Sequence, residues 1–478
     1  MVRRHVLGFT AIALLGCTSY VAAGCGGSST NTSNAGQAQN DAGEDSGSGS
    51  SSGGASGSSS GAAEDSGSKS GGDSGTDGGH TPSSMYPAFP VDVAQVVNQG
   101  GKVLSAPNIV TVTWSSDPSA TTWNGYDDAI GASTYWNAIN SEYGVGAATN
   151  GGHVSITTAA PSGLSDQDLD TMVSTNVGNG TWPANTPNTL YAIYMPPGTS
   201  LLFGGAADAG GQDACAAGVG GYHEETQTGN YVYAIMPHCS MFGTPEIEDS
   251  ASHELNEAST DPHPNTNLAY GGFDNDHLSY EFFNGFQDEL GDACENFYPW
   301  AYYTDTEAAF PYDVQRQWSN KGAKEGHNPC APAPSGPFYN VTAIGSELTT
   351  INVDLSSLGL GAGMVQTKGY KGTLNKPLTI HLGAFSDAPT SGPWTVTPNV
   401  DMQFNFPDQN NNAINNGTAT VTLDKTSVVN GDTITVTITP TAWSSLGVVY
   451  VWFRNLLGTA SPSSTPPHGD YPIIISQN

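Results

Sequence analysis

Short apolar runs bounded by turn-forming residues recur through the first half of the chain. NIVTVTW (108–114) alternates β-branched residues and predicts a strand. TLYAIYMPP (189–197) and YVYAIMP (231–237) are continuous apolar runs, which are typical of buried strands. A helix is expected around YDDAIGASTYWNAINSEYG (126–144). Strands mixed with a few helices predict an α/β or α+β core that extends to about Cys330.

A second helix is predicted over TPEIEDSASHELNEASTDP (244–262). Thr244 can cap it, and Pro245 suits its first position. Pro262 should end it, because a proline pushes the preceding residue out of helical geometry. Apolar residues recur at helical spacing and are expected to face the core; they are Ile247, Ala251, Leu255 and Ala258.

Beyond APAPSGP (331–337), a linker by composition, the pattern becomes strand-rich and helical periodicity is hard to find. Regularly spaced short strands predict an all-β, immunoglobulin-like sandwich. The runs are FYNVTAI, TTINVDL, LTIHLGAF, TATVTL, DTITVTITP and VVYVWFRN. This half has no obvious catalytic cluster and is interpreted as an accessory module. Carbohydrate could bind through Trp394, Trp443 or Trp452, although single tryptophans in a sandwich more often belong to its core.

The N-terminus predicts export. A basic start at residues 3–5 precedes an apolar stretch, and small residues precede Cys25, as in a bacterial lipoprotein signal; a plain cleaved signal peptide is the alternative. A diacylated Cys25 would anchor the protein at the outer-membrane surface without spanning it. Serine and glycine dominate the next segment, which is expected to be a flexible tether. The predicted divisions are 1–25 signal, 26–83 tether, 84–332 first folded domain and 333–478 β-sandwich.

Composition narrows the choice of partners and compartment. The chain has 44 acidic and 12 basic residues, a net charge of -32, which argues against nucleic acid and anionic membrane surfaces and is compatible with metal cations. Besides Cys17 and Cys25, four of the six cysteines remain, which predicts two disulfides in an oxidising compartment. Three pairings are open; short loops favour Cys215–Cys239 and Cys294–Cys330.

The candidate chemistry lies in the helix at H-E-x-x-E. His253 and Glu257 stand four residues apart and project from one side of a helix. Two such ligands, a third from elsewhere and one open position are what catalytic zinc needs. Glu254 is adjacent and is a candidate general base. The alternative is a routine histidine–glutamate surface pair.

Several motifs in series resemble a group of secreted bacterial proteins with the pattern S-H-E-L-x-E-A-x-T-D-P, then E-[IL]-[GA]-D-x-C, then V-Q-x-x-W-S-N. Here they read SHELNEASTDP, DELGDACE and VQRQWSN, and the resemblance covers roughly residues 95–330. The group resembles zincin-type metallopeptidases and, more distantly, the plant phosphate-induced, Exordium-like cell-wall proteins. The resemblance implies that His253 and Glu257 are zinc ligands and Glu254 the base.

The third ligand is left open. Asp292 is favoured, Glu289 lies three residues before it, and Asp261 at the helix end is a competitor. His223 could bind the metal or stabilise an oxyanion, or it could be a satisfied histidine in a disulfide-held loop. FDNDH (273–277) hints at calcium as an alternative cation.

Three functions follow as hypotheses. The first is a surface-tethered extracellular zinc peptidase acting on protein, peptide or cell-wall material. The second is a non-catalytic cell-surface protein that binds glycan or protein, with a structural metal or none. The third is a glycoside hydrolase, which would need a carboxylate pair that the sequence does not single out.

Overall fold

The computed structural model describes residues 81–203, 212–286, 289–295, 300–358, 363–400, 403–408, 412–458 and 469–477. The predicted signal, Cys25 and the tether up to residue 80 lie outside the described residues. The described residues belong to one compact unit. Of these residues 36% are in strands and 21% in helices, so the fold is β-rich with few helices. None of the helices described is long and apolar enough to cross a membrane.

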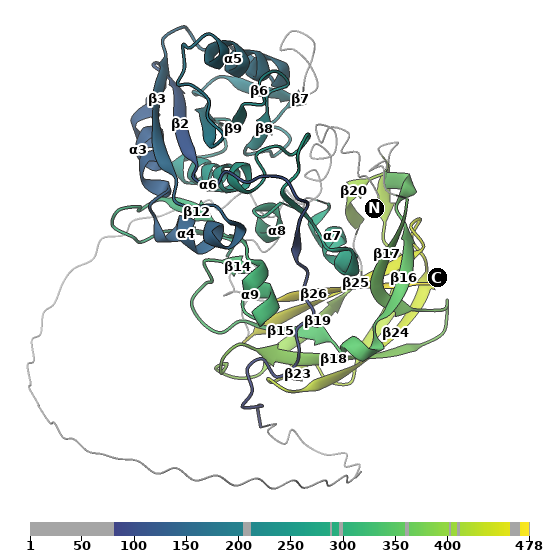
Figure 1. The fold of residues 1–478 in the computed structure, drawn as a ribbon. Helices are drawn as coiled ribbons and strands as arrows, with labels where there is room; N and C mark the ends of the chain where they lie inside the picture. The colour runs from purple at the N-terminus through teal and green to yellow at the C-terminus, as the bar shows by residue number, and fades with distance from the viewer. Residues whose placement is uncertain are drawn as a thin grey trace, which may run out of the picture. The chain divides into compact units, whose positions relative to one another are not determined.

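A five-stranded sheet organises the first part of the chain (Figure 1). Four of its strands are parallel and one edge strand is antiparallel. Their order is β3 (Thr149–Ile156), β2 (Asn108–Trp114), β5 (Thr189–Tyr194), β9 (Val232–Met236) and the antiparallel β8 (Tyr222–Glu225). The three strands expected from apolar runs in this part are confirmed as β2, β5 and β9.

Both faces of this sheet are buried, which explains its continuous apolar strands. Leu190, Ala192 and Tyr194 of β5 pack into one core cluster, with residues of three helices. The alternate residues Tyr191 and Ile193 pack into a second cluster on the other face. The helices on the first face are α3 (Ala120–Ile130), α4 (Thr134–Asn140) and α6 (Thr244–Thr260), and α5 (Asp166–Gly178) supplies the second cluster.

Shorter elements complete this part. The helices are α7 (Leu278–Asn284), α8 (Asp292–Glu295) and α9 (Asn320–Glu325), with 3-10 turns η2 (Ser141–Tyr143) and η3 (Asn275–His277). The paired strands are β1 (Val96–Asn98) with β10 (Tyr270–Phe273), β11 (Tyr302–Thr304) with β12 (Asp313–Gln315), and β13 (Gln317–Trp318) with β14 (Cys330–Ala331). A three-stranded sheet has the order β4 (Gly163–Ser165), β6 (Ser200–Phe203) and β7 (Gln212–Asp213).

The single helix predicted over 126–144 is wrong in its extent, because the chain forms α3 and α4 with a break between them. A Cβ on Gly131 would lie 2.4 Å from the carbonyl oxygen of Ala148, so the chain passes too closely here for a larger residue. Ser133 then caps α4 by accepting a hydrogen bond from the backbone N–H of Trp136 at 3.0 Å. Residues 131–133, Gly-Ala-Ser, therefore separate the end of α3 from the start of α4.

Helix α6 forms as predicted, and its four apolar residues are all buried in the core cluster against the sheet. Its cap differs from the prediction: Gly243 occupies the N-cap position, and Thr244 is the first helical residue. The Oε2 of Glu246 accepts a hydrogen bond from the Gly243 N–H at 2.8 Å, which satisfies a donor at the helix start. Pro245 lies in the first turn, where its missing N–H costs nothing.

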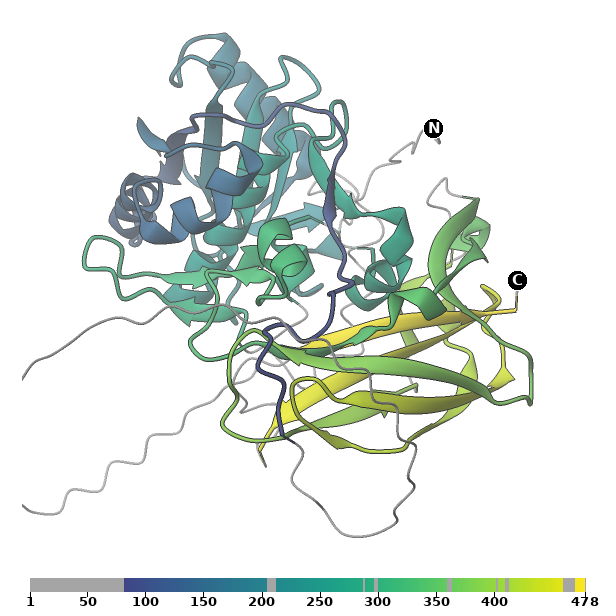
Figure 2. The same ribbon diagram turned by 60° about the horizontal axis from the view of Figure 1, so that its bottom comes forward.

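The C-terminal part consists of two sheets that share one core (Figure 2). The four-stranded sheet has the order β15 (Tyr339–Ala343), β18 (Leu378–Ser386), β24 (Thr433–Ala442) and β22 (Thr418–Leu423). The six-stranded sheet has the order β16 (Thr349–Asp354), β17 (Met364–Lys371), β26 (Asp470–Ser476), β25 (Val448–Leu457), β19 (Trp394–Asn399) and β23 (Ser427–Val428). A further pair is β20 (Gln403–Pro407) with β21 (Ala413–Asn415), and 3-10 turns are η4 (Gly345–Glu347) and η5 (Ser356–Leu358).

The tryptophans considered for carbohydrate binding pack into this part instead. Trp394 is buried, and its indole N–H donates to Asn455 at 3.0 Å. Trp452 is buried, and the guanidinium of Arg454 lies 4.5 Å from the centroid of its ring in a cation–π contact. Trp443 is partly buried against the shared core. Each of the six strand runs predicted for this half is confirmed by a strand.

The described residues contain two disulfides, and both are the pairs that short loops favoured: Cys215–Cys239 and Cys294–Cys330. The second one ties α8 to β14, although 36 residues separate its cysteines along the chain. Because β14 pairs with β13, this bond attaches the segment around Asp292 to the rest of the fold. This attachment limits the freedom of Asp292, a candidate metal ligand.

Asp127 on α3 gives the fold a testable pH dependence. Its Oδ1 accepts a hydrogen bond from the hydroxyl of Tyr194 at 2.7 Å, and its Oδ2 is buried without a partner. Burial raises the pKa of this carboxyl from 3.8 to about 7. The unfolded chain releases the proton near pH 4 and the folded protein only near pH 7. The free energy of unfolding should therefore fall across that window, by up to about 4 kcal/mol at about 1.4 kcal/mol per pKa unit.

Replacing this carboxyl by an amide should remove that dependence. We expect Asp127→Asn to unfold at a higher denaturant concentration than wild type at pH 8 and to differ little from it at pH 4. Chemical denaturation from pH 4 to 8 measures this. Asp128→Asn, at the exposed neighbouring position, is the matched control and should retain most of the wild-type slope. Equal slopes in wild type and Asp127→Asn would contradict the assignment.

Candidate metal centre

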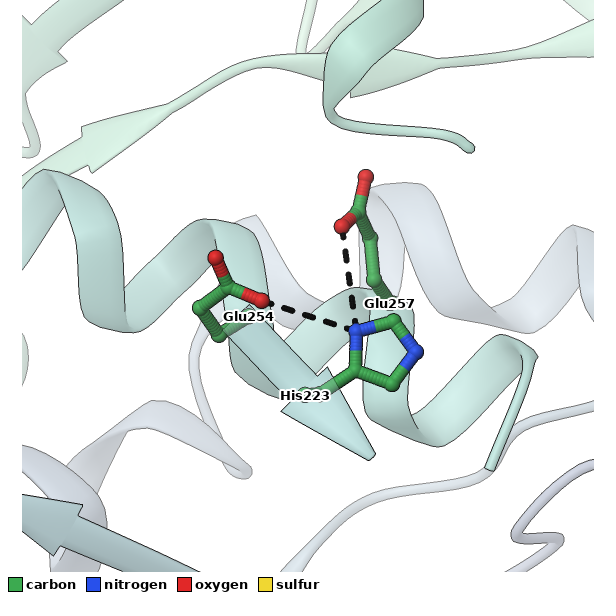
Figure 3. Close-up of side chains that lie close together, drawn as sticks. All are labelled: His223, Glu254 and Glu257. Atoms are coloured by element: carbon green, nitrogen blue, oxygen red, sulfur yellow. Dashed lines mark ion pairs between the residues drawn. The ribbon is translucent and has the colours of Figure 1, made fainter. Parts of the chain in front are cut away.

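Two secondary structure elements carry the central side chains. His223 lies on the edge strand β8, and His253, Glu254 and Glu257 lie on α6. Figure 3 shows the imidazole of His223 directed toward the carboxylates of Glu254 and Glu257. All four side chains are largely buried. The strand edge therefore meets the helix over its polar side, while the apolar side of α6 faces the core.

The first group of ligand atoms is formed by His253, Glu257 and Asp292. The Nε2 of His253 lies 2.9 Å from the Oε2 of Glu257 and 3.6 Å from the Oδ1 of Asp292. All three atoms lie within 4.8 Å of one another, close enough to hold one metal ion. Two zinc ligands in tetrahedral geometry would stand about 3.4 Å apart. The residues that sequence reasoning favoured are thus brought together.

Gln315 of β12 links these residues into a closed ring of hydrogen bonds. Its Nε2 donates to the carbonyl of Gly291 at 2.7 Å, so its Oε1 faces the Nδ1 of His253 at 2.9 Å. Gly291 in turn donates its N–H to the Oε1 of Glu257 at 2.7 Å. An amide oxygen only accepts, so the Nδ1 of His253 must carry a proton. The Nε2 of His253 is then the nitrogen available to a metal ion.

Position 291 requires a glycine. A Cβ at this position would lie 2.7 Å from the Nδ1 of His253 and 2.8 Å from the Oε1 of Glu257. The backbone of the segment 289–292 can therefore reach the helix only with a glycine there. Leu290 holds the same segment from the other side by accepting the N–H of Trp318 at 2.8 Å.

His223 forms a second group with Glu254 and Glu257. Its Nδ1 lies 3.5 Å from the Oε2 of Glu254 and 4.0 Å from the Oε2 of Glu257, and these three residues also satisfy the geometry of a metal site. Its Nε2 lies 3.1 Å from the backbone carbonyl of Asp261 and 3.6 Å from the Oε1 of Glu289. The Oε2 of Glu257 is common to both groups.

Burial and the neighbouring charges shift the pKa values of these groups in different directions. Burial alone would lower the pKa of His223 and of His253, but the surrounding carboxylates raise both pKa values well above the ordinary value. Burial raises the pKa of Glu289 and of Asp292 well above its ordinary value, and neighbouring carboxylates add to it. Burial would also raise the pKa of Glu257, yet His253 and the backbone amides lower it. The site attracts positive charge.

The other candidate ligands have separate roles. Glu289 precedes α8 and reaches His223, so it does not share a helix face with Asp292 as considered from spacing. Asp261 accepts the N–H of Ala269 with its Oδ1 at 2.7 Å, and its carboxyl is not part of either group. In FDNDH, Asp274 caps η3 and pairs with His277 at 2.7 Å, and this motif contributes to neither group.

Sequence reasoning missed the roles of Gln315 and Gly291. Both lie inside motifs of the resemblance, VQRQWSN and DELGDACE, but neither is a residue type that binds zinc. The hint in the sequence is their position, because each lies in a motif that accompanies the H-E-x-x-E helix. Their function depends on contacts 24 to 62 residues apart along the chain.

Comparison of the chain with family models, with curated proteins and with solved structures finds no match. The chemistry of the site is therefore inferred from its own geometry.

Removing the amide of Gln315 should weaken metal binding without removing a ligand. In Gln315→Leu, His253 loses the acceptor that orients its ring, and we expect zinc affinity to fall about 10- to 100-fold. Competition with a chromophoric chelator measures this. Gln366→Leu, at an exposed position on β17, is the matched control and should bind zinc like wild type. Unchanged affinity in Gln315→Leu would show that the hydrogen-bonded ring does not orient His253.

Proposed function

We propose that this protein is an extracellular zinc-dependent peptidase. The observation that carries the proposal is the convergence of His253 Nε2, Glu257 Oε2 and Asp292 Oδ1. A further carboxylate, Glu254, lies on the same helix as His253 and Glu257. One imidazole and two carboxylates form an accepted zinc ligand set that leaves a position for water. A second carboxylate ligand makes the set more anionic than one with two histidines, and somewhat less selective for zinc.

The residues divide into binding and proton-transfer roles. His253, Glu257 and Asp292 would hold the ion, which when bound lowers the pKa of a water molecule toward about 7 and polarises a carbonyl. Glu254 would accept a proton from the attacking water and deliver it to the leaving amine. His223, 3.5 Å from Glu254, orients this carboxylate and as an imidazolium can stabilise the developing oxyanion. The Gln315 amide keeps the His253 tautomer fixed during the cycle.

The carboxylates of the site differ in their exposure. The Glu254 and Glu257 side chains are 7% and 2% exposed, whereas those of Glu289 and Asp292 are 23% and 18% exposed. A peptide substrate would therefore approach from the side of Glu289 and Asp292. The acidic surroundings favour substrates without dense negative charge.

The wider architecture fits an exported enzyme. In this proposal the α/β part is a zincin-like catalytic domain, and the C-terminal sheets form an immunoglobulin-like accessory sandwich. The predicted lipoprotein signal at Cys25 and the tether would hold both at the bacterial cell surface. Substrates would be proteins, peptides or cell-wall material in reach of that surface. Two disulfides suit this oxidising location.

A structural metal is the second candidate. The observation that favours it is the burial of the cluster, since Glu254 and Glu257 are at most 5% exposed as whole residues. A buried ion that joins α6 to the start of α8 would stabilise the fold without any reaction. The protein would then act as a binding protein for glycan or protein at the cell surface.

One pair of variants separates these functions. We expect Glu254→Gln to lower peptide hydrolysis by about 10²- to 10⁴-fold, because the general base is lost, while the zinc held by His253 remains. His253→Ala should lose both activity and that zinc. Hydrolysis of unfolded casein and zinc content by mass spectrometry measure these effects. Glu325→Gln and His327→Ala, at exposed positions, are the matched controls.

The failure of each function is visible in the same data. If the protein binds zinc through His253 but hydrolyses no peptide, the result favours the structural metal. Hydrolysis that survives Glu254→Gln would contradict the role of Glu254 as base. Zinc content unaffected by His253→Ala would contradict the ligand set.

A further inference from the structure

The tautomer of His223 is determined by a backbone group. Its Nε2 lies 3.1 Å from the carbonyl oxygen of Asp261, and a carbonyl can only accept a hydrogen bond. In the neutral imidazole the proton is therefore on Nε2, and the lone pair of Nδ1 points toward Glu254 and Glu257. Facing two buried carboxylates, this nitrogen carries either a proton or a cation, and a metal ion that binds here takes the place of the proton.

The charges of the whole cluster support the same conclusion. It holds four carboxylates, those of Glu254, Glu257, Glu289 and Asp292, and two imidazoles. Within the described part of the chain, the ion pairs of these six residues are all with one another. With all four carboxylates ionised and both imidazoles neutral, one divalent cation would leave two negative charges in a buried site. Two divalent cations would neutralise it.

We propose that this protein binds a second divalent cation, held by the Nδ1 of His223, the Oε2 of Glu254 and the Oε2 of Glu257. The separations of 3.5 and 4.0 Å from Nδ1 to the two carboxylate oxygens are compatible with one ion about 2.1 Å from each donor. One nitrogen and two oxygens suit zinc and the other divalent ions that accept mixed ligands.

The two cations would share one oxygen atom. Glu257 Oε2 belongs to both groups, whereas its Oε1 accepts the N–H of Gly291 and of Asp292. Two ions on a single oxygen stand at most about 4.2 Å apart, close to the spacing of two-metal sites. Repulsion at that distance makes the second ion the weaker one, by at least about tenfold.

The second ion has a consequence that rests on the proposed peptidase function. A cation on the Oε2 of Glu254 lowers the basicity of this carboxylate, so that it accepts a proton from water less readily. Occupancy of the second site therefore weakens the general base, and excess zinc inhibits the enzyme. The first ion would be the catalytic one, and the second would act as a regulator that responds to the free concentration of zinc.

Zinc binding to the full-length protein tests this inference independently of activity. Titration against a chromophoric chelator should give two zinc ions per chain, the second at least tenfold weaker. Glu254→Gln, which is nearly isosteric, and His223→Ala should each retain the stronger ion and lose the weaker one. His153→Ala, at a partly exposed position on β3, is the matched control and should bind two. Circular dichroism checks that each variant is folded.

The outcomes distinguish this inference from the proposed function. No zinc in the wild-type protein would overturn both. One zinc per chain that His253→Ala removes and His223→Ala retains would overturn the second site and leave the proposed peptidase standing. A second zinc that survives both His223→Ala and Glu254→Gln would also overturn the second site, because its ligands would lie elsewhere.

Discussion

The carboxylate of Glu257 is the group on which the rest of this site depends. One of its oxygens accepts two backbone N–H groups, from Gly291 and Asp292, and the other lies 2.9 Å from the Nε2 of His253. A buried carboxylate is costly unless its charge is met by donors or cations. These contacts meet it, and in doing so they join the helix α6 to a segment that is distant in sequence.

This joining explains why the surrounding elements have their forms. Gly291 lacks a side chain because its backbone approaches His253 and Glu257 directly. Gln315 stands where one amide can both donate to Gly291 and accept from His253. The disulfide between Cys294 and Cys330 holds the segment after Gly291 to its neighbouring strand pair, which limits the freedom of Asp292. Preorganisation of this kind reduces the entropy lost when an ion binds.

The edge strand β8 adds a second layer to the same cluster. It places His223 over Glu254 with its ring oriented by a backbone carbonyl, so that a nitrogen faces carboxylates. The result is a site with more negative charge than its imidazoles can balance. In the metal-free protein, protons compensate, which is why the pKa values of both histidines lie well above the ordinary value. Cations compete with those protons, and that competition underlies both proposals.

The amino-acid sequence by itself determined the local features. Alternation and apolar runs located β2, β5 and β9, and helical spacing put His253 and Glu257 on one side of α6, because side-chain directions within one element follow from its backbone. The long helix predicted across Gly131 failed, since the close approach of Ala148 that requires a glycine there is a contact between distant segments.

Tertiary structure alone decided how the site is completed. The sequence favoured Asp292 but left Glu289 and Asp261 open as the third ligand, and only the path of the chain brings Asp292 to His253 and Glu289 to His223. The physical reason is that a ligand's usefulness depends on where its atom lies, and contacts across tens of residues are set by packing and by the disulfide. A local sequence pattern does not reveal those contacts.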